Sequence, residues 1–97
     1  MSNPYYDSDS DLVLVGEVDP REAYQFDTVA VWKSKTTGKL VWDADSGCSC
    51  PTPFDNFDPK PLPETWADFE RTVNENGADP TDRHALLEQV REMGGAR

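Results

Sequence analysis

Two cysteines separated by one residue are the side chains with the clearest chemical potential in this chain. Cys48 and Cys50 are its only cysteines and lie in the run Gly-Cys-Ser-Cys-Pro. Two thiolates at this spacing can bind a metal ion, but a structural zinc site needs two further Cys or His ligands. The chain has one histidine, His84, so a metal set of Cys48, Cys50, His84 and an Asp would be unusual. We expect one or both sulfurs to be small buried apolar groups and predict no cofactor.

A redox role for the cysteine pair has equally little support from its surroundings. No Lys, Arg or His lies next to Cys48 or Cys50 in the sequence to lower a thiol pKa. A small metal-binding or redox protein that uses Cys48 and Cys50 therefore stays an alternative to the main hypothesis below.

The acidic residues that precede the cysteines briefly resemble a calcium loop. Asp43, Asp45 and Ser46 start the pattern, but Phe54 stands where a bidentate Glu is required. We expect Asp43 and Asp45 to be carboxylates on a solvated strand face, with a weak, irregular cation site as the alternative.

Motifs for catalysis are missing from the sequence. It has no Gly-x-Ser-x-Gly, no His-Glu-x-x-His and no phosphate-binding Gly-rich loop. His84 could act as a general base beside a carboxylate, but near the start of a helix it is expected to be a surface residue. We predict that the protein is not an enzyme.

The stretch from Ser46 to Asp58 has the composition of a recognition surface. It combines two prolines with the rings of Phe54 and Phe57 and with acidic Asp55 and Asp58. Rigid aromatic groups with a polar rim are typical of protein-binding surfaces. The alternative, that the two phenylalanines pack into the core as the loop crosses the sheet, is at least as consistent with the sequence.

Charge restricts the partners of the protein. The net charge is −10, from 19 acidic and 9 basic residues, which repels nucleic acid and anionic membranes. A negative charge favours basic partners, so an acidic nucleic-acid mimic that occupies a DNA-binding protein is a further alternative. The charge can also serve solubility alone. With no secretory signal or membrane-length apolar run and no disulfide framework, we expect a cytoplasmic setting.

Apolar alternation predicts three strands, over 12–18, 24–33 and 40–45. In the first, Leu12, Leu14, Gly16 and Val18 are expected to share one face. A three-residue loop, Thr36–Gly38, with Gly38 in the left-handed conformation would join the second strand to the third. That hairpin would place Trp32 opposite Trp42, and a slip of one residue would separate the two rings onto different faces.

A proline-rich loop and two helices are expected to follow. Five prolines interrupt 46–64, which excludes a regular ladder or a helix interior. Thr65–Asp68 resembles a capping box, and Asp79 with Pro80 is a typical helix start. Leu86, Val90 and Met93 would form the apolar stripe of the second helix, and Gly94-Gly95 would end it.

The predicted fold is α+β: a three-stranded, mainly antiparallel sheet made of an N-terminal strand and a β-hairpin, a long Pro-rich loop, and two C-terminal helices packed on the sheet. We expect a flexible acidic arm over 1–10, one domain over 11–94 and a tail over 95–97. The expected core residues are Trp32, Trp42, Phe26, Trp66, Phe69, Leu86 and Val90.

The run Asp45-Ser-Gly-Cys-Ser-Cys-Pro-Thr-Pro-Phe-Asp-Asn-Phe57 resembles a family of short uncharacterised proteins encoded by phages of actinobacteria. The resemblance continues through Leu12–Asp19, Tyr24-Gln-Phe26 and the Trp32/Trp42 hairpin. It covers about the first sixty residues. It implies a domain of unknown function made inside an infected cell, and it carries over no site residues.

These observations lead to one main hypothesis. The protein is a small acidic, non-enzymatic phage accessory protein that binds a host or phage protein, with the loop 46–58 as the candidate surface. Neither nucleic acid nor a membrane is expected as a partner. The chain is expected to be a monomer or a homodimer formed through an open sheet edge.

Overall fold

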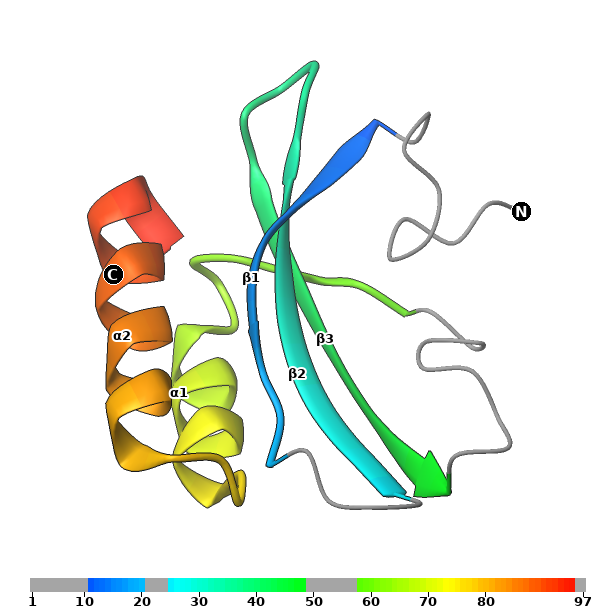
Figure 1. Ribbon diagram of the computed structural model, residues 1–97. Helices are drawn as coiled ribbons and strands as arrows, with labels where there is room; N and C mark the ends of the chain where they lie inside the picture. The colour runs from blue at the N-terminus through cyan, green and yellow to red at the C-terminus, as the bar shows by residue number, and fades with distance from the viewer. Residues whose placement is uncertain (1–10, 21–24, 49–57, 96–97) are drawn as a thin grey trace.

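A computed structural model describes residues 11–20, 25–48 and 58–95 of the chain. Within these ranges the protein is α+β, with an antiparallel sheet of four strands in the order β1-β2-β3-β4. The strands are β1 (Leu12–Val18), β2 (Gln25–Ser34), β3 (Leu40–Cys48) and the two-residue β4 (Lys60–Pro61). Helices α1 (Trp66–Glu75) and α2 (Pro80–Val90) lie on one side of the sheet, and a short π-helix, η1 (Arg91–Gly95), follows α2 (Figure 1).

The three predicted strands are present, but the third extends to Cys48 instead of ending at Asp45, and the predicted count of strands was one too low. Periodicity could not indicate β4, because it is short and its second residue is Pro61. Proline donates no hydrogen bond and is found on edge strands for that reason. β4 is such an edge: it pairs with β3 through Val41↔Pro61 and Trp42↔Lys60.

The predicted hairpin register was wrong by one residue. Strand β2 pairs with β3 through Trp32↔Val41 and Val31↔Trp42, so the two tryptophans lie on opposite faces of the sheet. The turn is longer than predicted: Gly38 N–H donates to Ser34 O at 3.0 Å, and Ser34 N–H donates to Lys39 O at 2.9 Å. Gly38 has φ +73°, as expected for the left-handed position. The loop has one residue more than the predicted Thr36–Gly38, because Lys35 also belongs to it.

A β-bulge in β1 also changes the predicted faces. Leu14 pairs with Trp32 and Gly16 with Val31, which leaves Val15 as the extra residue. Leu14 and Gly16 therefore face opposite sides of the sheet, contrary to the expectation of one shared face. The bulge directs Val15 and Val18 towards the helices while Leu12 stays on the side of Trp32.

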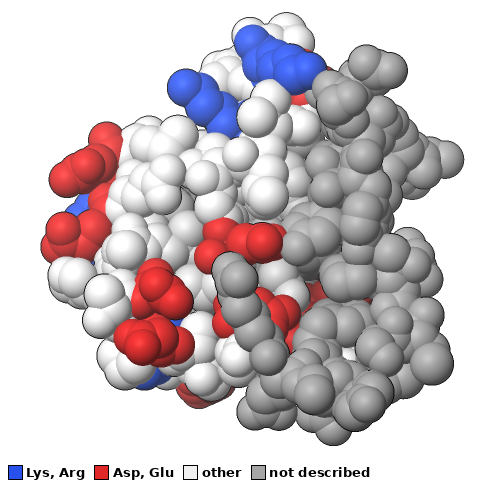
Figure 2. All heavy atoms as spheres, viewed as in Figure 1, with Lys and Arg blue, Asp and Glu red and all other residues white. Residues whose placement is uncertain are grey.

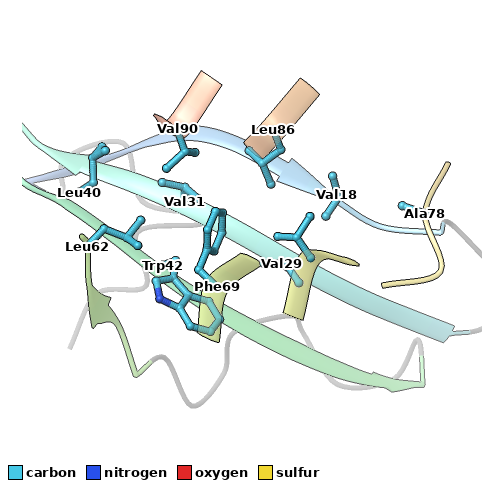
Figure 3. Packing of buried hydrophobic residues seen from close by; sticks show 11 residues of the cluster. Val18, Val29, Val31, Leu40, Trp42, Leu62, Phe69, Ala78, Leu86 and Val90 are labelled. Carbon is cyan, nitrogen blue, oxygen red and sulfur yellow. The ribbon is translucent and has the colours of Figure 1, made fainter. Parts of the chain in front are cut away.

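Two groups of apolar side chains are buried on the two faces of the sheet. The larger one lies between sheet and helices and is drawn in Figure 3. Its buried residues include Val29, Val31, Leu40, Trp42, Leu62, Phe69, Val73, Leu86 and Val90, with Trp66 partly buried against them. On the other face, Trp32 and Ala30 are fully buried, with Leu12 and Val41 packed against them. The predicted core is thus confirmed except that Trp66 is only partly buried; the side chain of Phe26 lies outside the described residues.

The helix ends agree with the sequence in part. Asp79 caps α2 by accepting a hydrogen bond from Thr81 N–H at 2.8 Å, with Pro80 at the first helical position. Gly94 has φ +92° and ends the helical run. Met93 was expected in the apolar stripe but is 39% exposed, because the chain leaves the α-helical path after Val90. Neither helix in the described part of the chain has the length and apolar character needed to span a bilayer.

Candidate functional site

The predicted recognition residues lie largely outside the described part of the chain. Phe54, Asp55, Phe57 and also Cys50 lie outside the residues that the structure describes, so the roles predicted for them stay predictions. Asp58 is described and is exposed. Its backbone N–H donates to Asp43 Oδ2 at 2.9 Å, which ties the C-terminal end of the segment 46–58 to strand β3.

Asp43 is the centre of this attachment, and its side chain is only 6% exposed. Its Oδ1 accepts hydrogen bonds from Ala44 N–H at 2.8 Å and from Lys60 Nζ at 3.0 Å. The expectation that Asp43 would be a solvated carboxylate was therefore wrong. A buried carboxylate needs a countercharge and hydrogen-bond donors, and Asp43 has both.

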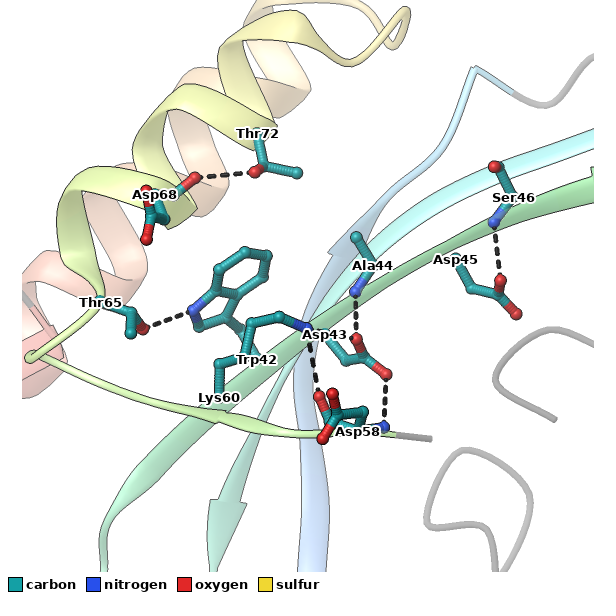
Figure 4. Close-up of polar contacts among 10 residues, drawn as sticks. All are labelled: Trp42, Asp43, Ala44, Asp45, Ser46, Asp58, Lys60, Thr65, Asp68 and Thr72. Carbon is teal, nitrogen blue, oxygen red and sulfur yellow. Dashed lines mark hydrogen bonds and ion pairs between the residues drawn. The ribbon is translucent and has the colours of Figure 1, made fainter. Parts of the chain in front are cut away.

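Lys60 supplies that countercharge from the edge strand β4. Besides the ion pair with Asp43, its Nζ donates to Asp58 O at 3.2 Å. The same ammonium lies 5.1 Å from the centroid of the Trp42 ring, a distance at which the ring's π-system attracts a cation. Figure 4 shows these groups around the point where the chain enters β4.

A second set of hydrogen bonds joins this point to helix α1. Trp42 Nε1–H donates to Thr65 Oγ1 at 2.8 Å, and the Thr65 hydroxyl donates to Pro61 O at 2.5 Å. Thr65 is the N-cap residue of α1, but its side chain accepts no hydrogen bond from the helix backbone. The predicted capping box is therefore not formed, because the threonine oxygen serves the buried indole instead.

We call Trp42, Asp43, Asp58, Lys60 and Thr65 the anchor cluster. Each member holds another through a contact given above, and together they connect β3, β4 and α1. Such a cluster can fix the position of a binding segment. It is poorly suited to proton transfer with a substrate, because the carboxylate of Asp43 is enclosed and already accepts three hydrogen bonds.

Sequence reasoning missed three members of the anchor cluster. Trp42 was expected only as a core residue, Thr65 only as a helix cap, and Lys60 had no assigned role. A weak signal was present in Asp-Pro-Lys-Pro, residues 58–61, where a lone lysine between prolines follows a strongly acidic segment. Its partner Asp43 could not have been identified without the register of β3 and β4.

Within the described residues, the structure shows no metal ligands that would join Cys48 and Cys50. His84 is exposed on α2, and its Nε2 lies 3.3 Å from Glu88 Oε1, one turn further along the helix. Over 11–20, 25–48 and 58–95, no three His, Cys, Asp or Glu residues are grouped so that they could hold a metal ion. The side chains of Cys48 and Cys50 lie outside the described residues, so the metal and redox alternatives stay predictions.

The acidic residue Asp45, considered above for a cation site, remains near the surface. It is partly buried, pairs with Thr28 across the sheet, and its Oδ1 accepts a hydrogen bond from Ser46 N–H at 2.9 Å. The described hydrogen bonds of the Asp45 carboxylate differ from those of Asp43: Asp43 accepts from the backbone N–H groups of Ala44 and Asp58, whereas Asp45 accepts from that of Ser46.

The fold and the anchor cluster define a small α+β domain whose sheet edge holds one end of an aromatic, acidic segment. A family model described as "Domain of unknown function (DUF7574)" matches residues 2–95, and the chain therefore belongs to that family. The expected membership in a family of unknown function is thereby confirmed. No curated protein and no solved structure matches the chain.

Proposed function

We propose that this protein is a non-enzymatic accessory protein that binds another protein through the segment 46–58. The observation that carries the proposal is the anchor cluster at the C-terminal end of that segment. Asp43 and Lys60 form an ion pair in which the carboxylate is 6% exposed, and Asp58 is bound to both partners. At its other end the segment continues strand β3, which includes Ser46, Gly47 and Cys48.

Holding both ends of a binding segment favours affinity. A segment that is restricted before binding loses less conformational entropy in the complex. Two prolines within it, Pro51 and Pro53, act in the same direction because each fixes a backbone torsion. Phe54 and Phe57 would supply the apolar contact area, and Asp55 and Asp58 an acidic rim suited to a basic partner surface.

The setting of the function is part of the proposal. The resemblance to actinobacteriophage proteins supports a phage-encoded protein that acts in the host cytoplasm on a host or phage protein. The net charge of −10 disfavours nucleic acid and anionic membranes as direct partners. On this proposal the protein does no catalysis and requires no cofactor.

The test is capture of partners from actinobacterial lysate by tagged protein, with mass spectrometry of the retained proteins. The informative variant combines Phe54→Ala, Asp55→Asn and Asp58→Asn, and its matched control is Glu75→Gln on the exposed part of α1. The proposal expects one stoichiometric protein that the triple variant loses and the control retains. Equal retention by both variants, with unchanged circular dichroism, would refute a role for the segment.

Salt separates this proposal from the nucleic-acid mimic. A mimic binds through many charges, so its capture should weaken steeply as the salt concentration rises. An interface that depends on buried phenylalanines should keep most of its affinity between low and moderate salt. Steep loss of capture that the triple variant does not alter would favour the mimic.

A further inference from the structure

The end of the β2–β3 hairpin differs in charge from the rest of the molecule. Lys33, Lys35 and Lys39 are exposed there. Figure 2 shows basic groups gathered at this end, whereas separate patches of acidic groups lie over the left, lower and central parts of the same view. Among the residues that the structure describes, Lys33 and Lys39 place two ammonium groups at this end of a chain whose net charge is −10. Among the described residues, no carboxylate forms an ion pair with Lys33 or Lys39.

A groove lies beside these lysines. It has a volume of about 570 Å³ and is lined by Val13, Val15, Lys33, Ser34, Lys35 and Gly38. We call it the tip groove. Its volume lies within the range of roughly 300–1,000 Å³ that is common for ligand sites.

The register explains how an apolar floor comes to lie beneath a basic rim. Val13 is directly opposite Lys33 in the β1–β2 ladder, and Lys33 is opposite Leu40 in the next. These three side chains therefore leave the sheet on the face that carries the helices. The hairpin extends beyond the end of α2 (Figure 1), so the helices do not cover this part of the face. Val13 remains 46% exposed as a result.

The rim of the groove is held in place by Asp11. Its carboxylate accepts hydrogen bonds from Ser34 Oγ at 2.5 Å and from Thr36 Oγ1 at 2.6 Å, and its backbone carbonyl accepts one from Lys35 N–H at 2.8 Å. The two hydroxyls hold the pKa of Asp11 below its ordinary value, with that of Ser34 as the larger cause. The backbone that carries the lysines is thus ordered before any partner arrives, which lowers the entropic cost of binding.

We propose that the tip groove binds an acidic, extended segment of a partner protein. One aliphatic or aromatic side chain of that segment covers Val13 and Val15, and a flanking carboxylate reaches Lys33. The apolar floor selects a side chain, which a phosphate backbone would not supply. The net charge of the molecule also opposes the approach of a long polyanion, whereas a short acidic segment places its few charges close to the lysines. This surface is distinct from segment 46–58, which begins at the opposite end of β3.

The test is a titration of ¹⁵N-labelled full-length protein, followed by NMR. The probes are short peptides with one Leu or Phe flanked on both sides by Asp and Glu. The control peptides replace the apolar residue by Ser, or the acidic residues by Lys. The proposal expects dissociation constants in the micromolar to millimolar range, with chemical shift changes concentrated at the amides of Val13, Val15 and Gly38, and much weaker effects of both control peptides.

Two variants with the same change in charge complete the design. Lys33→Glu alters the rim, while Arg71→Glu alters an exposed position on α1 whose only described ion pair is with Asp68. Since neutralising one exposed ion pair weakens binding by about fivefold at most, reversing the charge of Lys33 should weaken the peptide by about fivefold to tenfold. Arg71→Glu should change its affinity less than about twofold.

Several outcomes would overturn the proposal. These are the absence of shift changes at millimolar peptide, shift changes of equal size in the two variants, or tighter binding of a single-stranded oligonucleotide than of any acidic peptide. The outcome is independent of segment 46–58, because the Phe54/Asp55/Asp58 triple variant should bind the acidic peptides as the wild type does. Failure of either surface can thus be distinguished from failure of the other.

Discussion

The ion pair between Lys60 and Asp43 gives a prediction whose size follows from the structure. Lys60→Met removes the ammonium and keeps a similar apolar stem beside Trp42. Asp43 then keeps its two backbone donors, Ala44 N–H and Asp58 N–H, but loses its countercharge. The Asp43 side chain is 6% exposed and that of Lys60 is 41% exposed, so the pair is neither a surface pair nor a fully buried one.

The expected cost lies between the two limiting cases. Exposed pairs contribute about 0–1 kcal/mol, and removing one partner of a buried pair costs about 3–5 kcal/mol. Because the lysine retains access to water, we expect Lys60→Met to lower the free energy of unfolding by about 1–2 kcal/mol. With a urea m-value of about 1–2 kcal/mol/M, the midpoint should fall by roughly 1 M.

The assay is urea unfolding followed by tryptophan fluorescence, applied to a double-mutant cycle. The variants are Lys60→Met, Asp43→Asn and their combination, and the control is Lys39→Met, which removes an exposed charge from the hairpin end. The cycle should give a coupling energy of about 1 kcal/mol, and the control should change stability by less than about 0.5 kcal/mol. Equal effects of Lys60→Met and Lys39→Met, with a coupling energy below about 0.3 kcal/mol, would refute the anchor as an energetic unit.

Three further predictions follow from single contacts. Gly95→Ala should destabilise the protein by about 1–3 kcal/mol in urea unfolding, because an added Cβ would lie 2.5 Å from Val90 Cγ1; an unchanged midpoint would contradict this packing. Trp42→Phe removes the indole donor to Thr65 and should lower the free energy of unfolding by about 0.5–1.5 kcal/mol for the hydrogen bond, beyond any loss of packing. Thr65→Val removes the acceptor of the same hydrogen bond and should lower the free energy of unfolding by a similar amount. Asp11 contributes stability that is present above its unfolded pKa and is lost as the pH falls through its lowered folded pKa, so between neutral pH and pH values below the ordinary 3.8 the wild type should lose more stability than Asp11→Asn. Parallel pH profiles of the two proteins would contradict this assignment.

Local features of the sequence were sufficient to predict most of the elements. The alternation of apolar residues predicted β1 with its observed bounds, Leu12–Val18, and predicted each end of β2 to within one residue of its observed position. Asp79 and Pro80 located the start of α2. Gly38 has the positive φ angle expected of it, while Gly94 ends the helical run as predicted. These features depend on torsion preferences and on contacts within a few residues, which is why a single sequence carries them.

The relations between elements depended on contacts that are remote in the sequence. The hairpin loop is one residue longer than predicted. Asp11, which directly precedes β1, binds Ser34 at the end of β2 and Thr36 in that loop. This one-residue difference places Trp32 and Trp42 on opposite faces, because side chains alternate along a strand. Local turn preferences alone could not select between the two loops.

Charge and periodicity determined from the sequence alone that this is a small acidic α+β domain with a distinctive segment at its centre. Only the tertiary structure decided which polar groups meet: Asp43 with Lys60 across the β3–β4 edge, and Trp42 with Thr65 across the core. The physical reason is that a carboxylate, an ammonium, a hydroxyl and an indole N–H are each satisfied by many partners, so their chemistry does not specify one. Chain topology and strand register bring the particular donor and acceptor within hydrogen-bond distance, and burial makes the pairing necessary.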